Sequence, residues 1–567
     1  MDFKNIIIEL LSNYVLKLSE SEMEEILEIP ANAEMGDYAF PCFKLAKTYR
    51  KAPNMIANDI GNDIQKDITE SDYISEVKIV GAYINFYVNK EKYVESILGK
   101  KGSLYNTTTD GKGKTIVLDY SSPNIAKPFH IGHLRTTIIG NSLYNIHNHL
   151  GYKCVGVNHL GDWGTQFGKL IVAYKLWGSK DRIENNGINE LTKIYVKFHE
   201  EAENNPELED EARAWFTKME NGNEEALELW QWFKDISLEE FNRIYKMLDI
   251  RFDSYAGESF YNDKMDAVIK DLEHKDLIEV SDGAKIISLE NENMPPCLIT
   301  KKDGSTLYAT RDITAAIYRK NEYDFEKCIY VTAFDQNLHF AQWFKVIEKM
   351  GFGWHDKLIH VPYGLVSMES GKLSSRKGKV IYLEDLLKES VEKTKKIIEE
   401  KNPNLKDKED VANIVGIGAI IFNDLYNNRI KDVVFSWDKV LNFEGETGPY
   451  VQYTYARAAS VLRKAEYSVN NDNINYSLLT NELEFALIKT IGRFQNVVRQ
   501  SAEKLEPSFI SRYVVDLAQD FNRFYHNCPI LVDDIDIKNA RLALVNNVKE
   551  IIKTALSLLG IKAPEQM

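Results

Sequence analysis

Apolar and polar positions follow clear periods in the first hundred residues. Phe3–Lys17 places apolar side chains every three or four positions, which predicts an amphipathic helix. Val77–Val80 and Tyr83–Val88 are short apolar runs that predict two strands. Gly99–Lys114 is rich in Gly, Lys, Thr and Asn, a composition typical of a linker. The pattern predicts a small mixed domain over residues 1–98, followed by a linker.

A strand–helix–strand unit follows the linker. Thr115–Tyr120 is an apolar run suited to a buried parallel strand. From His130 apolar residues recur at helical spacing as far as Gly151, a residue type that favours helix ends. Cys154–Asn158 predicts the next strand. This unit builds doubly wound α/β sheets. Further strands are predicted at Cys297–Thr300, Lys327–Thr332 and Leu358–Val361.

Helical patterns dominate elsewhere. Residues 180–250 are charged and helix-like, which predicts an insertion into the sheet domain. Leu383–Glu400 and Val411–Tyr426 predict helices on either side of a polar linker at Lys401–Asp410. Residues 450–567 are predicted to be helical throughout.

Composition changes this picture little. Hydrophobic residues make up 44% and charged residues 27% of 567 residues, which excludes wholesale disorder. The longest apolar-rich stretch, Val411–Phe422, is too short to span a bilayer. The acidic N-terminus lacks the basic start of a secretory signal. Five dispersed cysteines without a C-x-x-C pair argue against a disulfide framework or zinc ribbon and favour a reducing cytoplasm.

Charge is distributed unevenly along the chain. The net charge is −15, which disfavours non-specific coating of nucleic acid. Residues 450–567 nevertheless hold 14 basic and 13 acidic residues. A polyanion would therefore be repelled least by this C-terminal segment.

Two histidines lie where the predicted strand Thr115–Tyr120 is followed by a predicted helix. Backbone N–H groups at a helix N-terminus attract phosphate, and His130 and His133 add donors there. Gly132 between them leaves room for a flat ring. The alternatives are a surface pair or half of a zinc site. Because no Cys or Glu stands at a spacing that completes a zinc set, we predict a nucleotide site without a metal.

A second candidate is the basic segment Gly371–Lys379, after the strand-like Val361–Val366. Short, flexible and densely basic loops suit closure over a triphosphate. The alternative is an ordinary solvated charge run. The two segments in this order are far more specific than either alone.

These segments resemble signatures of class I aminoacyl-tRNA synthetases. His130–His133 matches the HIGH signature, and Lys372–Arg376 is similar to the KMSKS signature. Ser121–Pro128 resembles the arginyl-tRNA synthetase form of this site. Further segments agree with that family: Gly161–Gly168, Gly257–Tyr261, Leu307–Asp312, Phe334–His339, Gly448–Tyr453 and Leu558–Pro564.

The resemblance implies an α/β fold with appended domains. Expected are an N-terminal α+β tRNA-contacting domain at 1–110 and a Rossmann-type parallel-sheet catalytic domain at 111–385, with the helical insertion at about 180–250. A helical connecting region at 386–449 and an all-helical anticodon-binding domain at 450–567 would follow.

The implied activity is ATP-dependent ligation of L-arginine to tRNA(Arg) through arginyl-adenylate, for protein biosynthesis. ATP with Mg²⁺ is the expected co-substrate, without a tightly bound cofactor or a resident metal. A cytoplasmic monomer without membrane association is expected. A separate editing domain is not expected, because polar sites reject analogues by about 10⁴ without editing.

An arginine site should be recognisable from its charges. A guanidinium requires carboxylates in a planar arrangement and neutral acceptors. Glu258, Tyr308 and Asp312 offer these, and the last two would share one face if a helix starts there. By resemblance Asn124 would join them, and Ser122 and Gln336 would orient the amino and carboxylate groups. Pro123 and His133 complete the expected arginine-binding set.

The implied ATP site combines both signatures. Its expected residues are His130, Gly132, His133, Lys372, Ser374 and Ser375. The fourth position of the second signature departs from the family pattern, because Ser375 replaces a lysine. Lys127 is expected to compensate, with Arg376 or Lys377 as alternatives. The predicted catalytic set is His130, His133, Lys127, Lys372, Arg376 and Lys377.

Candidate tRNA contacts combine stacking faces with cations. They are Tyr83 and Asn85 near the N-terminus, and Tyr450, Tyr453, Arg457, Tyr513 and Tyr525 in the C-terminal region. The alternative is that these residues belong to ordinary sheet or helical core.

Other functions fit the sequence less well. A catalytically silent paralogue is disfavoured by the intact His130, His133 and Asp312. A small nucleotidylyltransferase would not need the long helical C-terminus. Among related synthetases, a cysteine enzyme would show a set of zinc ligands, which this sequence lacks. A glutamate enzyme would need a cationic pocket, which Glu258, Tyr308 and Asp312 contradict.

Overall fold

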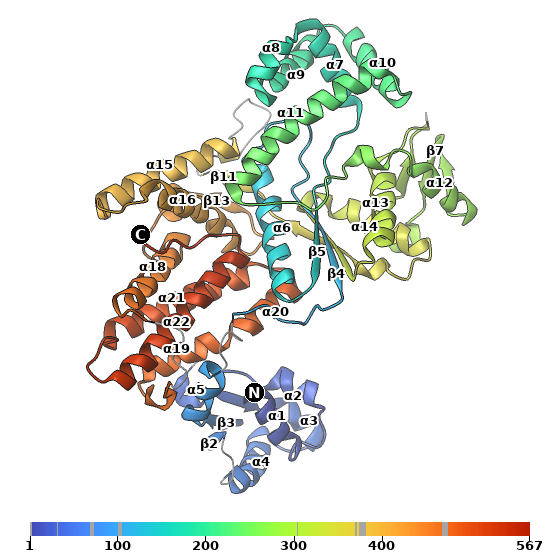
Figure 1. The fold of residues 1–567 in the computed structure, drawn as a ribbon. Coiled ribbons are helices and arrows are strands. Elements are labelled where there is room, and N and C mark those ends of the chain that lie inside the picture. Colours follow the sequence, from blue (N-terminus) through green and yellow to red (C-terminus); the bar gives the residue numbers. More distant parts are fainter. Residues whose placement is uncertain are drawn as a thin grey trace. The chain divides into compact units, whose positions relative to one another are not determined.

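The computed structural model describes residues 3–30, 32–68, 73–99, 105–302, 304–368, 371–372, 382–467 and 474–567. The chain divides into two compact units. The first comprises Met1–Tyr105, Ala458–Phe494 and Gln519–Ile551, and the second comprises Asn106–Arg457, Gln495–Ala518 and Ile552–Met567. Figure 1 shows the elements of both units.

A four-stranded parallel sheet lies at the centre of the second unit. Its strands run in the order β10 (Leu358–Tyr363), β9 (Lys327–Ala333), β4 (Thr115–Asp119) and β5 (Lys153–Val157). Helix α6 (Ile131–His149) connects β4 to β5 and packs on the sheet (Figure 1). The predicted strand–helix–strand unit is confirmed, as are the strands at Lys327–Thr332 and Leu358–Val361.

The predicted strand Cys297–Thr300 exists as β8, but it does not belong to the parallel sheet. It pairs antiparallel with β7 (Ala284–Ile287), which pairs with β6 (Glu279–Ser281). The apolar run predicted a strand correctly, since Cys297 and Ile299 are buried in the same core as the parallel sheet. Its partner is set by the adjacent hairpin, which periodicity does not reveal.

The region 180–250 is helical, as predicted. Figure 1 shows helices α7 to α11 gathered together, with α11 the longest of them. The helices are α7 (Thr165–Trp177), α8 (Lys180–Asn186), α9 (Ile188–Ala202), α10 (Glu207–Glu220) and α11 (Glu224–Leu248). The other helices around the two sheets are α12 (Met265–His274), α13 (Tyr308–Tyr323) and α14 (Asn337–Lys349).

A small mixed sheet follows β10. Strand β11 (Val366–Met368) pairs antiparallel with β12 (Gly371–Lys372) and parallel with β13 (Val433–Phe435). Strand β13 was not expected, because a run of three residues carries too little pattern. The expected polar linker at Lys401–Asp410 is shorter in the structure. Helix α15 (Leu383–Lys401) extends to its first residue, and α16 (Lys408–Leu425) begins before its last.

Helices make up the remainder of the described C-terminal region. They are α17 (Trp437–Val440), α18 (Gly448–Lys464), α19 (Glu482–Gly492), α20 (Phe494–Lys504), α21 (Ser508–Asn527) and α22 (Ile535–Leu558). This confirms the helical pattern predicted there.

The N-terminal segment forms a sheet with helices around it. Strand β3 (Tyr83–Val88) lies between β1 (Tyr38–Pro41) and β2 (Ile74–Val80). The helices are α1 (Phe3–Ser12), α2 (Glu20–Ile26), α3 (Ala46–Tyr49), α4 (Pro53–Asp67) and α5 (Lys90–Leu98). Helix α1 ends at Ser12, earlier than the predicted Lys17, although Val15 beyond its end is still buried in the core.

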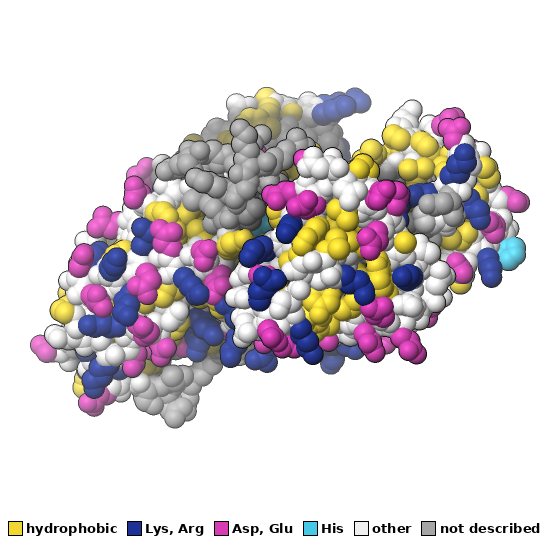
Figure 2. Space-filling model, turned by 90° about the horizontal axis from the view of Figure 1, so that it is seen from above, with side chains coloured by type: hydrophobic (Ala, Val, Ile, Leu, Met, Phe, Trp, Pro, Cys, Tyr) yellow, Lys and Arg dark blue, Asp and Glu magenta, His cyan; other side chains and the backbone are white. Residues whose placement is uncertain are grey.

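Acidic and basic side chains are interspersed over the face drawn in Figure 2. The net negative charge is therefore not gathered as a single acidic field on that face. The five cysteines are buried and unpaired, which agrees with the prediction of no disulfide framework. Within the described residues, no helix has the length and apolar character needed to cross a membrane.

Candidate active site

Two histidines cap the N-terminus of α6 reciprocally. The Gly132 amide donates to Nδ1 of His130 at 3.0 Å, and the His130 amide donates to Nδ1 of His133 at 3.2 Å. The ring centroids are 3.9 Å apart. These bonds satisfy backbone donors that a helix N-terminus otherwise leaves unpaired. Each imidazole is thus fixed by the backbone at the start of the helix.

Both imidazoles are neutral at neutral pH. Burial and the nearby Lys127 charge lower the pKa of His130. Burial, followed by His130 and Lys127, lowers the pKa of His133 to about 3. Since each Nδ1 accepts a hydrogen bond, each neutral ring carries its proton on Nε2. The site therefore offers two neutral N–H donors, and positive charge for a phosphate must come from other residues.

Gly132 is required by the close approach of the His130 ring. A Cβ at this position would lie 2.7 Å from Cε1 of His130 and 2.9 Å from Nδ1. Any side chain would displace the capping imidazole. In this structure the space at Gly132, expected to admit the flat ring of a nucleotide, is occupied by the protein's own His130 ring.

The loop between β4 and α6 is held by side-chain bonds. Ser122 and Ala126 adopt positive φ angles of 47° and 62°. The Ser122 hydroxyl donates to Oδ1 of Asp119 at 2.9 Å and accepts from the His159 amide at 3.2 Å. The Ser122 amide donates to Asn158 Oδ1. Ser122 therefore lies where the carboxyl ends of β4 and β5 meet.

The same loop carries three further candidates. Pro123 accepts from the Gly161 amide, and Asn124 is exposed beside Gly161. Lys127 is exposed, and its charge contributes to lowering the pKa of both histidines. The loop thus presents an amide and an ammonium group near the start of α6.

Asp162 organises the segment that carries Glu258. Its buried carboxylate accepts from Nζ of Lys234 at 2.6 Å, from the Ser259 amide at 2.8 Å and from the Ser259 hydroxyl at 2.7 Å. The Glu258 amide donates to the Leu160 carbonyl. Asp162 fixes the one-turn helix η4 (Glu258–Tyr261) against the loop that follows β5.

Glu258 lies in an environment that disfavours its charge. Its side chain is 12% exposed. Burial raises its pKa to about 7, with contributions from Asp312 and Asp162, while Arg311 opposes the increase. Nη1 of Arg311 lies 3.8 Å from Oε2 of Glu258. An additional cation from a substrate would favour the ionised form of this carboxylate.

Tyr308 and Asp312 lie one turn apart at the start of α13, which confirms the predicted helix start. Tyr308 is 63% exposed. Oδ2 of Asp312 forms a hydrogen bond with Nε2 of His339 at 2.5 Å. His339 was not expected to take part, although it belongs to a segment that resembled a known family. Gln336 is exposed just before α14.

These residues form one continuous set of contacts within the second unit. Pro123 bonds to Gly161, Leu160 to Glu258, and Glu258 pairs with Arg311, which neighbours Asp312. These contacts connect the loop before α6 to the partly buried carboxylates of Glu258 and Asp312.

Comparison with known proteins agrees with this arrangement. The model of the class I (R) tRNA synthetase catalytic domain matches residues 93–437, more than half of the chain. The DALR anticodon binding domain matches 451–567, and the arginyl tRNA synthetase N terminal domain matches 2–88. The chain belongs to the arginyl-tRNA synthetase family.

Relatives of the family align over the whole chain. Identity is 57% to the arginine–tRNA ligase of Alkaliphilus metalliredigens and 56% to that of Clostridioides difficile, with 100% of each chain covered. The arginyl-tRNA synthetase structure from Plasmodium falciparum has a TM-score of 0.83 at 27% identity, covering 100% of this chain and 98% of that one. The Thermus thermophilus arginyl-tRNA synthetase has the same TM-score at 24% identity and shows the shared fold.

The second signature of this arginyl-tRNA synthetase family member is described only in part. Lys372 lies on β12, and its backbone pairs with Ser367. Ser374, Ser375, Arg376 and Lys377 lie outside the described residues. Just after them, Tyr382 forms a bridge with His130, and the Leu383 amide donates to the Phe129 carbonyl at 3.0 Å. The chain therefore returns from the second signature to the start of α6.

The candidate tRNA contacts differ in accessibility. Tyr453 is 41% exposed, with the Arg457 guanidinium 5.0 Å from its ring centroid. Tyr83, Tyr450 and Tyr525 are partly buried. Tyr513, at 2% exposure, is a core residue of its helix and presents no stacking face, because its position lies on the buried side of α21. Asn85 is also fully buried, and both polar atoms of its amide lack a hydrogen-bond partner among the described residues.

Sequence reasoning missed four residues with structural roles: Asp162, Arg311 and His339 at the site, and Arg135 on α6, which forms a buried ion pair with Asp424. Three of them belong to segments that resembled the family, yet a motif does not reveal which member supports another. The sequence offers one indication for Arg135, because a basic residue within an apolar helical run is usually buried only when it pairs with an acidic side chain.

Proposed function

We propose that this protein activates L-arginine with ATP and transfers the arginyl group to its cognate tRNA, releasing AMP and diphosphate. The observation that carries the proposal is that one unit holds both the neutral histidine pair at the α6 N-terminus and the partly buried carboxylates of Glu258 and Asp312. The first suits phosphates and the second suits a guanidinium. Relatives named arginine–tRNA ligase support the same reaction.

In the first step, an arginine carboxylate oxygen attacks the α-phosphorus of ATP. The bond from that phosphorus to the bridging oxygen breaks, and diphosphate leaves with the electron pair. We assign His130, Gly132 and His133 to phosphate binding, through the Nε2 donors of the two imidazoles and the close packing that Gly132 allows at the start of α6. Since both imidazoles are neutral, Lys127 and Lys372 would supply the positive charge, with Arg376 and Lys377 as further candidates. Ser374 and Ser375 would contribute neutral hydroxyl groups to the ATP site.

Arginine recognition is assigned to the acidic pocket. Glu258 and Asp312 would face the guanidinium, with Tyr308 and Asn124 as neutral partners. Ser122, Pro123, His133 and Gln336 would orient the amino and carboxylate groups. Lysine cannot form the forked contact and would leave a buried carboxylate without a second partner, which disfavours its binding.

In the second step, a terminal ribose hydroxyl of tRNA attacks the arginyl carbonyl. The carbonyl–phosphate bond breaks, and AMP leaves. We assign tRNA contacts to residues 1–110 and 450–567, through Tyr83, Tyr450, Tyr453, Arg457 and Tyr525. Asn85 lies on the same strand as Tyr83, and its fully buried amide, which has no partner among the described residues, would have to become accessible to contact tRNA. Residues 111–385 would form the catalytic domain, and 386–449 its helical connection.

ATP is expected to arrive with Mg²⁺ on its phosphate oxygens, the ligands this ion prefers. The described residues contain no group of three or more His, Cys, Asp or Glu side chains that would hold a metal by themselves. We further propose a cytoplasmic monomer, from the family resemblance and the free cysteines.

The test is arginine-dependent exchange of labelled diphosphate into ATP, with and without purified tRNA(Arg). Lysine replaces arginine as the matched control. Exchange that requires arginine and fails with lysine supports the proposal. Folded protein that binds tRNA but catalyses no exchange under any of these conditions would contradict it and favour a silent paralogue.

A further inference from the structure

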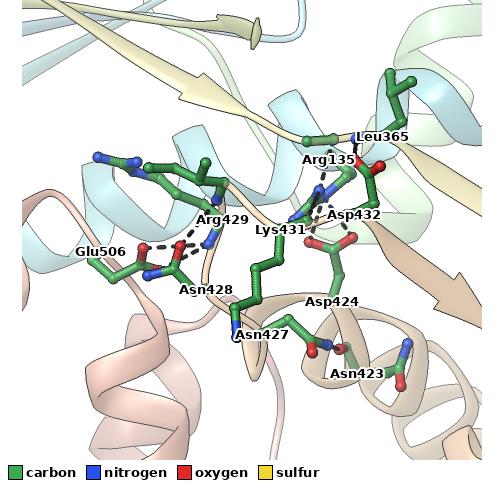
Figure 3. Close-up of polar contacts among 12 residues, drawn as sticks. Arg135, Leu365, Asn423, Asp424, Asn427, Asn428, Arg429, Lys431, Asp432 and Glu506 are labelled. Atoms are coloured by element: carbon green, nitrogen blue, oxygen red, sulfur yellow. Dashed lines mark hydrogen bonds and ion pairs between the residues drawn. The ribbon is translucent and has the colours of Figure 1, made fainter.

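Arg135 lies on α6, two residues after His133, and is 1% exposed. Its Nε lies 3.0 Å from Oδ2 of Asp424 on α16, an ion pair buried on both sides. Figure 3 shows the guanidinium directed into this group of contacts. Burying an ion pair costs free energy unless further hydrogen bonds satisfy both charges. The other contacts of the Arg135 guanidinium therefore indicate its structural role.

The remaining Arg135 bonds go to backbone carbonyls. Nη1 donates to Gly364 at 2.7 Å and to Lys431 at 2.9 Å. Gly364 follows the end of β10, and Lys431 precedes β13. One guanidinium group therefore joins α6, α16 and two loops that lie far apart in sequence.

Both backbone amides and both backbone carbonyls of Gly364 and Leu365 form hydrogen bonds. The Gly364 amide donates to the Arg429 carbonyl, and its own carbonyl accepts from Arg135. The Leu365 amide donates to Oδ1 of Asp432 at 2.7 Å, and its carbonyl accepts from the Val433 amide. This dipeptide is thus bound from both sides (Figure 3).

Close packing restricts the same position. A Cβ on Gly364 would lie 2.6 Å from the Ile430 carbonyl oxygen and 2.7 Å from the Lys431 carbonyl carbon. Arg429 extends the support, with Nε donating to the Leu505 carbonyl and its amide facing Glu506. The chain has little freedom where it leaves β10.

Gly364 and Leu365 lead directly into β11, whose partner β12 carries Lys372. Beyond the second signature, Tyr382 bridges back to His130. The two chain segments flanking the second signature are therefore both attached to α6, one through Arg135 and the other at the helix start. The first attachment depends on a side chain and the second on backbone bonds.

We propose that Arg135 is a positioning residue, which fixes the base of the β11–β12 pair relative to the His130–His133 helix start. The inference rests on the proposed function, since it assigns Arg135 to the geometry of the ATP site. Its two carbonyl bonds are the essential contacts, and the Asp424 ion pair holds the guanidinium in place. Loss of the carbonyl bonds should impair ATP use and leave arginine binding intact.

The test compares Arg135→Lys with the wild-type protein. Lysine keeps a cation for Asp424 but lacks the planar fork that serves two carbonyls as well. We expect kcat of arginine-dependent diphosphate exchange to fall about 10- to 100-fold, as small displacements of reacting groups do, with a raised KM for ATP. The arginine Kd from calorimetry should stay within about twofold, because the acidic pocket does not contact Arg135.

Arg541→Lys is the matched control. Arg541 also pairs with a buried carboxylate, Glu484, at 2.7 Å and donates to a carbonyl, that of Pro529, at 2.6 Å. With saturating tRNA, this variant should keep the wild-type kcat and ATP KM even if its melting temperature falls. An equal kinetic effect in Arg541→Lys would overturn the inference, because general loss of stability would then explain both.

A second variant covers the case in which Arg135→Lys does not fold. Asp432 is exposed, and Asp432→Ala removes only the acceptor of the Leu365 amide. It should change the same ATP parameters in the same direction. Wild-type activity in both variants, or parallel losses for ATP and arginine, would reject the positioning role. A wild-type protein without arginine-dependent exchange would instead reject the proposed function, and this inference with it.

Discussion

Glu258 is a carboxylic acid whose charge changes with pH near neutrality. Its pKa of about 7 follows mainly from burial. The ionised form attracts a guanidinium and the neutral form does not. Arginine affinity should therefore fall as pH decreases below about 7, by up to tenfold per unit, and level off above it. Calorimetric titration of arginine between pH 6 and pH 8 measures this directly.

Glu258→Gln provides the control for that prediction. The amide keeps the shape but does not ionise, so arginine binding should be weaker at pH 8 and nearly independent of pH. A wild-type affinity that is flat across this range would show that Glu258 does not face the substrate cation.

Lys127 is predicted to supply charge that two neutral histidines lack. Lys127→Ala should lower kcat of arginine activation by about 10², the effect typical of losing one transition-state electrostatic donor. Diphosphate exchange at saturating tRNA measures it. Lys112→Ala, another exposed lysine before β4, should retain wild-type activity. An unchanged kcat in Lys127→Ala would assign the compensating charge to Arg376 or Lys377.

At the scale of elements, Asp162 joins η4 to α11. Asp162→Asn would leave the Lys234 ammonium without its buried counter-charge and weaken the contact to Ser259. We expect the free energy of unfolding to fall by about 3 kcal/mol, as when one member of a buried pair is removed. Arginine should also bind less tightly, since Glu258 lies on the released turn. Urea denaturation and calorimetry measure the two effects.

Asp235→Asn is the matched control for this change. Asp235 lies on α11 next to Lys234 but is exposed, and its carboxylate accepts a hydrogen bond from the Gln231 amide. Its stability should stay within about 0.5 kcal/mol of wild type. If Asp162→Asn behaved in the same way, the ion pair would not be what holds η4.

Element prediction succeeded where the pattern was local. The strands β4 and β5 and helix α6 follow from apolar runs and helical spacing, because burial of one face imposes that spacing. The strand β8 was predicted correctly, but its antiparallel partner β7 was not, since pairing partners are chosen by the tertiary fold. Strand β13 left no signal, yet it supports the base of the second signature through β11.

At the scale of the molecule, the first unit is built from three separate parts of the chain. Tyr93 packs against Phe3 at a ring-centroid distance of 5.0 Å and against Phe485 of α19 at 5.6 Å. Asp37 pairs with Lys489 of the same helix at 3.2 Å. The N-terminal segment thus covers apolar surface on α19.

Deletion of residues 1–98 should therefore destabilise α19 as well as remove the N-terminal segment. Uncovering Phe485 alone forfeits the burial of an aromatic side chain, about 2 kcal/mol. Hydrogen exchange should accelerate for amides of α19 and remain unchanged for α16, which belongs to the second unit. Equal protection of α19 in the full-length and shortened proteins would show that this helix folds without the N-terminal contacts.

Local sequence patterns specify most of the helices and strands and the residue types available to the candidate site. Periodic burial specifies helices and strands, and the paired histidines and carboxylates identify which ligands can bind. Only the tertiary structure decided which residues support others: His130 and His133 cap one helix, Asp162 holds Glu258, and Arg135 joins α6 to Gly364. These relations depend on contacts between distant segments and on burial, which shifts the pKa of Glu258 to about 7, and neither is encoded in local spacing.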